Sequence, residues 1–146
     1  MTLQKWQAQG LLKPHKTSPK EIAELLAAAD QDLADCETPG LSAGWRLNIA
    51  YNAALRCATA ALAACGYRPA HSESHHWRTI QSLAHTLGLD AAVVRQLDGF
   101  RKKRNVSAYD RIGTVSDHEA AEMAALAKDL RMNVERWLRE HHSDLL

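Results

Sequence analysis

Residues 41–66, LSAGWRLNIAYNAALRCATAALAACG, form a long stretch without proline that closes on a glycine, a residue suited to a left-handed helix cap. The positions expected to share one face of this helix are mostly small: Ala50, Ala53, Ala54, Cys57, Ala58, Ala61 and Ala64. Small side chains allow neighbouring helices to approach closely. This stretch is therefore predicted to be the central helix of a bundle.

The composition of the 146-residue chain also favours helices. Alanine (25) and leucine (19) are abundant, whereas valine and isoleucine, which favour strands, number nine together. A chain of this length can bury one core without disulfides or metals. We predict an all-α fold, an up-and-down bundle of four to five helices that forms a single domain over residues 18–146, after a flexible lead-in over residues 1–17.

Local signals mark the other helices. Ser18-Pro19-Lys20-Glu21 combines an N-cap serine, a proline at the first helical position and a glutamate three residues after the cap. Ser116-Asp117-His118-Glu119 is a second capping box, and Asp90 is a further N-cap. The pattern from about Ser74 to Leu87 predicts another helix. Short connections between these segments indicate antiparallel neighbours.

Three tryptophans, Trp45, Trp77 and Trp137, fall at core phases of these helices and are expected to pack in the core. The sequence has no run of eighteen apolar residues, and its first twenty residues lack the apolar segment of a signal peptide. We therefore expect a cytoplasmic protein that does not contact a membrane.

The cysteines and the clustered histidines indicate no metal site. Cys36, Cys57 and Cys65 lack a Cys-x-x-Cys spacing, so we expect reduced thiols without a nucleophilic role. His71 and His75 have the i, i+4 spacing of two ligands on a helix, but no complete ligand set surrounds them. Neither a metal nor another cofactor is predicted.

Charge is unevenly distributed, although the net charge of +1 excludes a protein that coats nucleic acid by bulk charge. Residues 95–111 hold six basic and two acidic residues, and residues 20–37 hold one basic and six acidic residues. These segments are either solvated faces, faces that complement each other within the chain or across a dimer, or a local anion site.

Arg104 interrupts the apolar stripe of the predicted fourth helix. The stripe runs through Val93, Leu97 and Phe100 to Arg104. A guanidinium at such a position must reach solvent, pair with a carboxylate or line a polar cleft. Asp110 and Glu119 are candidate carboxylates, and the functional alternative is a phosphate.

Asn105 and Tyr109 share a neighbouring face of the same helix and place an amide and a phenol near Arg104. Together with Arg101 and Asp110, these residues form the predicted binding site, in which Arg104 holds a phosphate.

The run Arg104-Asn105-x-x-x-Tyr109-Asp110 resembles the signature of HEPN domains, small helical bundles named for higher eukaryotes and prokaryotes nucleotide-binding. Residues 51–55 (YNAAL), 66–69 (GYRP) and 76–80 (HWRTI) support this resemblance, which covers roughly residues 18–140. It is strongest with bacterial members that carry Arg-Lys-Arg-Asn-x-x-x-Tyr-Asp. The resemblance implies that the predicted site binds RNA or a nucleotide, where Tyr109 donates a hydrogen bond or stacks on a base. It also implies a homodimer, and many HEPN proteins are metal-independent ribonuclease toxins with a nucleotidyltransferase or antitoxin partner.

The sequence departs from the catalytic pattern of that family, in which two Arg-x(4–6)-His motifs line one cleft. Tyr109 stands where the histidine is expected, and the next histidine, His118, lies fourteen residues after Arg104. A phenol, with a pKa of about 10, is a poorer general base at neutral pH than an imidazole, with a pKa of about 6.5. We therefore expect binding without hydrolysis.

Two other functions stay open at this point. One is a metal-independent ribonuclease toxin, in which Tyr109 or a histidine from elsewhere moves the proton. The other is a protein–protein interaction module, in which the basic helix docks an acidic partner or the acidic helix of a second copy.

Overall fold

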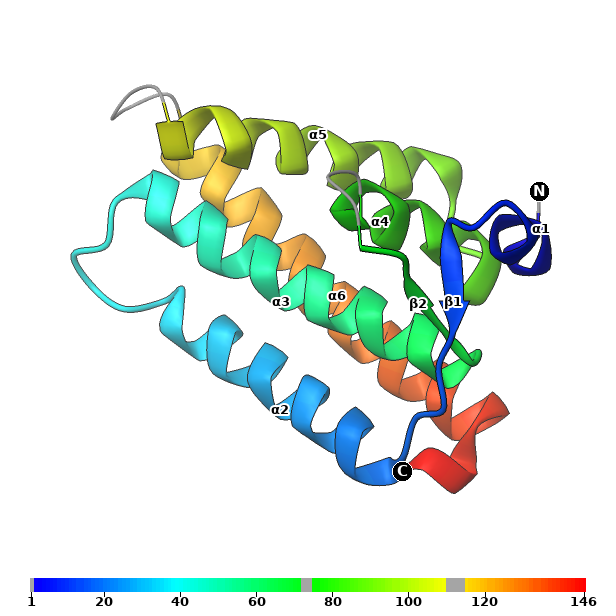
Figure 1. Ribbon diagram of the computed structural model, residues 1–146. Helices are drawn as coiled ribbons and strands as arrows, with labels where there is room; N and C mark the ends of the chain where they lie inside the picture. The colour runs from blue at the N-terminus through cyan, green and yellow to red at the C-terminus, as the bar shows by residue number, and fades with distance from the viewer. Residues whose placement is uncertain (1, 72–74, 110–114) are drawn as a thin grey trace.

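The computed structural model describes residues 2–71, 75–109 and 115–146, and within these ranges the side chains of all residues except 105–109. The elements are α1 (Leu3–Ala8), β1 (Leu12–Pro14), α2 (Pro19–Asp35), α3 (Ala43–Ala64), β2 (Tyr67–Pro69), α4 (His75–Thr86), α5 (Ala91–Tyr109), α6 (Asp117–His141) and a final 3₁₀ turn, Ser143–Leu145 (Figure 1). The all-α prediction is confirmed. None of the helices in these ranges combines the length and apolar character required to cross a membrane.

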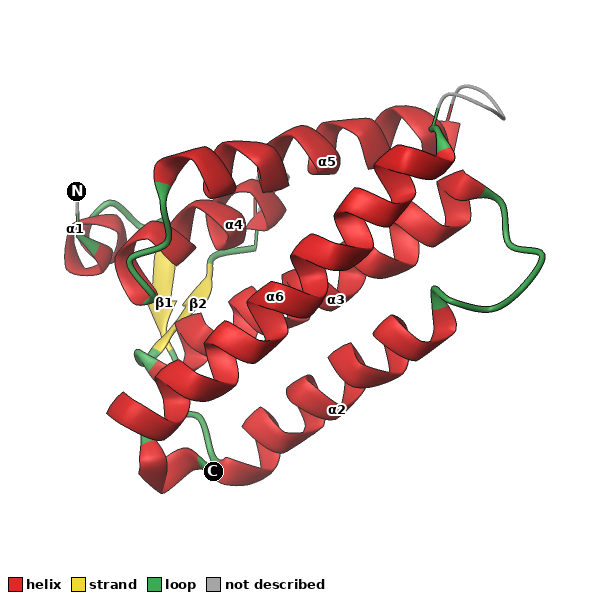
Figure 2. Ribbon diagram, turned by 180° about the vertical axis from the view of Figure 1, so that it is seen from behind, coloured by secondary structure: helices red, strands yellow, loops and turns green. Residues whose placement is uncertain are grey.

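Helix α3 lies at the centre of the bundle. It packs against α2, α4, α5 and α6, as the two opposite views show (Figures 1 and 2). Most of its alanines and Cys57 are buried between these neighbours, together with Leu47 and Tyr51. Helices α2 and α3 are antiparallel, whereas α3 and α6 run in the same direction. The prediction of a central helix with a small-residue surface is confirmed.

The helix starts form where the local signals place them. The Ser18 hydroxyl accepts a hydrogen bond from the Glu21 amide at 3.1 Å and caps α2. Ser116 and Glu119 form a reciprocal capping box at the start of α6. Gly66, with φ of +92°, follows the end of α3 in the left-handed conformation. These features need only neighbours along the chain.

The first seventeen residues differ from the flexible lead-in that the sequence predicts. They form α1 and β1, and Leu3, Trp6 and Leu12 are buried together against Leu62 of α3. The Trp6 ring also meets the His85 ring edge-on, with the centroids 5.2 Å apart. These apolar side chains dock the segment on one end of the bundle, since their burial removes apolar surface from water.

Strand β1 pairs with β2 as a two-stranded antiparallel ribbon. The register pairs Leu12 with Pro69, Lys13 with Arg68, and Pro14 with Tyr67. Hydrogen bonds continue at both ends, from the Ala70 amide to the Leu11 carbonyl at 3.0 Å and from the His15 amide to the Gly66 carbonyl at 2.8 Å. The ribbon joins the N-terminal segment to the connection between α3 and α4.

The predicted burial of the tryptophans is wrong for Trp45, whose surface is 61% exposed. Trp77 and Trp137 are partly buried, and Trp137 packs against the main core. Trp45 shares a face of α3 with Asn52 and Arg56, seven and eleven residues later, and this is the side of the helix that faces solvent. The phase of the polar residues therefore explains the exposed indole.

The acidic segment 20–37 is complemented by cations of α3 and α6. The pairs are Asp30–Arg131, Asp32–Arg56 and Glu37–Lys128. The Arg131 guanidinium contacts both carboxylate oxygens of Asp30, at 2.9 and 3.0 Å. In these contacts the acidic segment 20–37 is thus paired with cations outside the basic segment 95–111.

Candidate functional site

Arg104 lies on the side of α5 that faces α3. Leu97 and Phe100, which precede it on the same stripe, are buried, and Arg104 itself is half-buried. Its Nε atom donates a hydrogen bond to the Asn48 side-chain oxygen at 2.6 Å. Its Cζ atom lies 5.2 Å from the centroid of the Tyr51 ring, in cation–π geometry. Helix α3 therefore orients the guanidinium through an amide and an aromatic face.

Tyr51 forms the base of this arrangement. Its ring is fully buried, and among the residues that the structure describes its hydroxyl has no hydrogen-bond partner. Burial raises the pKa of the Tyr51 phenol to about 12, an effect that the positive charges of Arg104 and Arg101 reduce and Asp98 increases. The phenol is thus a neutral group in charged surroundings, and its hydroxyl is available as a donor.

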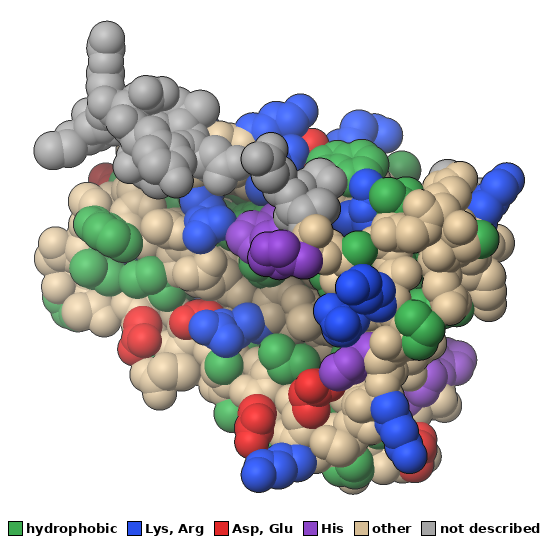
Figure 3. Space-filling view, viewed as in Figure 1, with side chains coloured by type: hydrophobic (Ala, Val, Ile, Leu, Met, Phe, Trp, Pro, Cys, Tyr) green, Lys and Arg blue, Asp and Glu red, His purple; other side chains and the backbone are tan. Residues whose placement is uncertain are grey.

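His76, in the first turn of α4, lies within the electrostatic field of the same arginines. Burial lowers the pKa of His76, and the nearby His75, Arg104 and Arg101 lower this pKa further. The rings of His75 and His76 meet edge-on with centroids 4.2 Å apart. In the space-filling view, histidine side chains lie beside Lys and Arg side chains on this face (Figure 3). His76 is therefore mostly neutral at neutral pH, with one ring nitrogen able to accept a proton.

The other residues of the predicted site have different positions. Arg101 is mostly buried, with 19% of its side chain exposed, and its Nε donates to the Asp98 carboxylate at 2.8 Å. Its charge is therefore balanced locally, which makes it a weaker phosphate ligand than predicted. Asn105 and Tyr109 belong to α5 by their backbone, but their side chains lie outside the described residues, as does Asp110.

Glu119, one of two carboxylates considered as partners of Arg104, is engaged by other groups. One oxygen accepts a hydrogen bond from the Ser116 amide at 3.0 Å, and the other lies 3.2 Å from the Lys103 ammonium. The hydrogen bond from Ser116 and the contact with Lys103 hold the pKa of Glu119 below its ordinary value. The second carboxylate, Asp110, lies outside the described residues. Among the contacts of the described residues, Arg104 donates a hydrogen bond to the Asn48 amide oxygen, which helps to orient the guanidinium.

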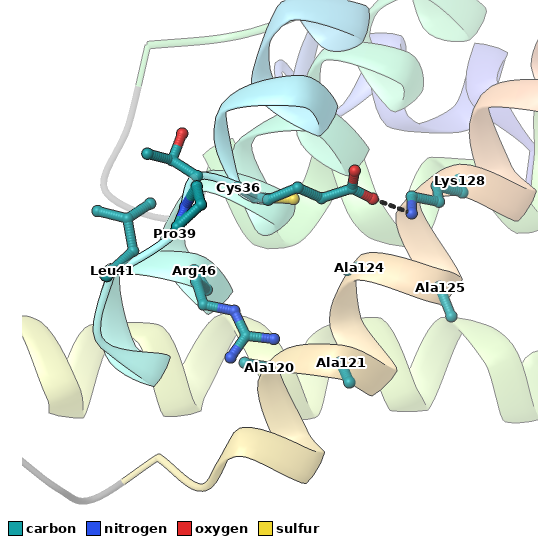
Figure 4. A pocket seen from close by; sticks show the side chains of 12 residues that line it. Cys36, Pro39, Leu41, Arg46, Ala120, Ala121, Ala124, Ala125 and Lys128 are labelled. Atoms are coloured by element: carbon teal, nitrogen blue, oxygen red, sulfur yellow. Dashed lines mark hydrogen bonds and ion pairs between the residues drawn. The ribbon is translucent and has the colours of Figure 1, made fainter.

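A separate hollow of about 500 Å³ lies between the α2–α3 connection and α6 (Figure 4). Its floor consists of Ala120, Ala121, Ala124 and Ala125. Two cations line it: Lys128 pairs with Glu37, and Arg46 lies 3.4 Å from Asp117. Both cations have a carboxylate partner, so an anion in this hollow would compete with Glu37 and Asp117 for them. We therefore assign the candidate site to Arg104 and the groups around it.

The candidate site consists of Arg104, Asn48, Tyr51 and His76, on α5, α3 and α4. Asn48 was missed by sequence reasoning because 56 residues separate it from Arg104. Tyr51 and His76 stand within the stretches 51–55 and 76–80, and that position was the signal that could have found them. Comparison with family models, curated proteins and solved structures gives no match for this chain.

Proposed function

We propose that this protein is a HEPN-like helical bundle that binds RNA or a nucleotide through Arg104 and does not hydrolyse it. The observation that carries the proposal is the placement of the Arg104 guanidinium, half-buried at a core position and oriented by Asn48 and Tyr51. A planar guanidinium that is held in place loses little conformational entropy when it binds a phosphate. Partial burial strengthens that interaction because the local dielectric constant is lower than in water.

The surroundings of Arg104 favour a phosphate over other ligands. Residues 101–104 are four consecutive cations, and the described carboxylates that contact them are Asp98 and Glu119. His76 adds an imidazole that gains positive charge when an anion approaches. A half-buried arginine with a neighbouring imidazole fits the phosphate of an RNA chain or a nucleotide.

The resemblance to HEPN domains supplies the partners of this proposal. We propose a homodimer in the cytoplasm and, as a protein partner, a nucleotidyltransferase or an antitoxin. Sedimentation analysis at several concentrations tests the dimer. A single species with the mass of one 16.2 kDa chain throughout would contradict it.

Replacing Arg104 by glutamine tests the proposed function. We expect Arg104→Gln to weaken binding of a fluorescein-labelled RNA, measured by fluorescence anisotropy, roughly 10- to 150-fold, since a charge-assisted hydrogen bond contributes about 1.5–3 kcal/mol. Arg136→Gln is the matched control, because Arg136 also donates to an asparagine oxygen, that of Asn133 at 2.6 Å, but lies on α6. The control variant is expected to bind RNA like the wild type.

The same variants separate binding from a structural role. Arg104→Gln is expected to leave the thermal midpoint within a few degrees of the wild type, because glutamine can keep a hydrogen bond to Asn48. A large fall in the midpoint with unchanged RNA affinity would show that Arg104 is a structural arginine, and the proposal would be wrong.

A metal-independent ribonuclease is the second candidate, and the position of His76 favours it. A neutral imidazole near an arginine could take the proton of an RNA 2′-hydroxyl, whose oxygen then attacks the adjacent phosphorus. The bond to the 5′-oxygen breaks, this oxygen takes up a proton, and a 2′,3′-cyclic phosphate remains. Arg104 would stabilise the developing negative charge. Incubation of total RNA with the protein and EDTA tests this: cleavage that is absent in both Arg104→Ala and His76→Gln would support the ribonuclease.

The interaction module has less support. Three carboxylates of the acidic segment 20–37 pair with cations of their own chain, so they are engaged before a second copy arrives. Size-exclusion elution that shifts strongly with salt, without any retention of RNA, would favour this alternative.

A further inference from the structure

Trp45 exposes an aromatic surface one helical turn before Asn48 of the candidate site. It lies in the first turn of α3, where its backbone amide donates to the capping hydroxyl of Ser42 at 3.3 Å. Its surface is 61% exposed, whereas that of Trp6 is 5% exposed and Trp77 and Trp137 are partly buried. A large aromatic side chain contributes most favourable free energy when its surface is buried. An indole held on a capped helix start and left in solvent is therefore suited to a ligand.

Trp45 and Asn48 stand one helical turn apart on the same side of α3. Asn48 in turn holds the Arg104 guanidinium. The start of α3 and the end of α5 lie at the same end of the molecule in both ribbon views (Figures 1 and 2). The exposed indole of Trp45 therefore stands one helical turn from the residue that holds the Arg104 guanidinium, at the same end of the molecule.

RNA has one group for each of these features. The face of a nucleobase stacks on an indole, and the neighbouring phosphate accepts hydrogen bonds from a guanidinium. In a duplex the bases are already stacked on each other, so only an unpaired base can cover Trp45. Arg104, half-buried on the side of α5 that faces α3, supplies the positive charge that the phosphate of such a strand meets here.

We propose that Trp45 is the stacking platform for an unpaired nucleobase of single-stranded RNA whose phosphate is bound by Arg104. This inference rests on the proposed function and narrows it to single-stranded RNA. Trp45 binds the base by stacking and Arg104 binds the phosphate of the backbone, so the two contacts contribute separately to the affinity. Base recognition by stacking is tolerant of sequence, and the site is therefore selective for strandedness more than for sequence.

An abasic oligomer separates the two contacts. Labelled oligouridine of about eight nucleotides is compared with a ribose-phosphate oligomer of the same length without bases, by fluorescence anisotropy. Trp45→Ala is expected to weaken oligouridine binding about 5- to 150-fold and to leave abasic binding within about twofold. Trp45→Phe keeps part of the affinity for oligouridine, because a phenyl ring still stacks. Arg104→Gln weakens the binding of both oligomers.

Met132→Ala is the matched control, because Met132 is a large side chain that is 66% exposed on α6, and it is expected to bind both oligomers like the wild type. Circular dichroism confirms that each variant is folded.

If Trp45→Ala weakens the binding of both oligomers equally, or of neither, the stacking role is wrong while RNA binding stands. If Trp45→Ala instead turns a dimer into a monomer with RNA affinity unchanged, Trp45 is a contact between copies and the inference is overturned. If the wild type binds neither oligomer, the proposed function itself fails.

Discussion

The Nε atom of Arg104 on α5 lies 2.6 Å from the side-chain oxygen of Asn48 on α3. The donor is charged and the acceptor is a neutral amide. The contact therefore orients the guanidinium, and Asn48 adds no negative charge beside it. Asn48 is therefore a positioning residue for Arg104, and its replacement by aspartate keeps the shape of the contact while adding a negative charge.

We predict that Asn48→Asp lowers RNA affinity and raises stability at the same time. Aspartate adds an opposite charge to a hydrogen bond that has one charged partner, and the resulting ion pair contributes up to about 1 kcal/mol more. The same charge competes with a phosphate for the guanidinium. Anisotropy with labelled RNA is expected to show about tenfold weaker binding, the equivalent of about 1.4 kcal/mol, and a thermal melt is expected to show a higher midpoint.

Asn133→Asp, at the equivalent Arg136–Asn133 contact on α6, is the control for the effect of added negative charge. It is expected to change RNA affinity much less than Asn48→Asp does. Equal effects of the two aspartates on binding would mean that overall charge, and not the local contact, governs affinity.

RNA binding is predicted to strengthen as the pH falls from about 8 to about 5.5, because His76 takes up a proton near the bound phosphate. In the free protein, burial and then the neighbouring charges of His75, Arg104 and Arg101 hold the pKa of His76 below its ordinary value. A phosphate opposes these effects and raises this pKa. The gain in affinity is limited to about tenfold per pH unit, the maximum for one linked proton.

Histidine resonances followed by NMR during a pH titration check this directly, with and without RNA. His76→Gln should flatten the pH dependence of binding, whereas His118→Gln, on the exposed side of α6, should not. The lowered pKa also affects folding: unfolded chains bind the proton at about pH 6.5, so the contribution of His76 to stability is present above that pH and is lost as the pH falls towards the folded pKa. An unchanged His76 pKa on RNA binding would contradict the placement of the phosphate.

Trp6 is predicted to stabilise the fold without contributing to RNA binding. It is buried with Leu3, Leu12 and Leu62, and the Arg78 guanidinium lies 5.5 Å from its ring centroid. Trp6→Ala should cost about 3–5 kcal/mol of unfolding free energy, measured by urea titration of the helical circular dichroism signal. Trp45→Ala, at the exposed tryptophan, should cost no more than about 0.5 kcal/mol. Similar losses for the two variants would show that the N-terminal segment is only loosely attached.

The elements that could be predicted from the sequence are those whose causes are local. Ser18 and Ser116 predict the starts of α2 and α6, because each serine accepts its capping hydrogen bond from the amide three residues later. The N-terminal segment could not be predicted in this way. Leu3 and Trp6 form a single i, i+3 pair, which is too short a pattern to predict a helix, and the burial of both depends on Leu62, which is distant in sequence. Strand β1 likewise gains its hydrogen bonds only when β2 lies beside it.

Arg104 of the candidate site could be predicted from the sequence, but the residues that contact it could not. Arg104 stood out because a cation occupied a core phase of a helix, and the structure places it half-buried at that phase. Its contacts with Asn48 and Tyr51 arise from the packing of α5 on α3, which a single helical pattern does not specify. The exposure of Trp45 was readable from the phase of Asn52 and Arg56, but the size of the indole suggested a core residue.

The β1–β2 ribbon is protected against recruiting further strands. Because its hydrogen bonds alternate along an antiparallel pair, the main-chain groups of residues 12, 14, 67 and 69 point away from the partner strand. Pro14 and Pro69 occupy two of these four positions and have no N–H to donate. Each open side thus keeps at most one donor within the strand, from Leu12 or Tyr67. A ribbon with so few outward donors is a poor template for intermolecular β-aggregation. The two prolines remove only outward-facing donors, so the hydrogen bonds between β1 and β2 are unaffected.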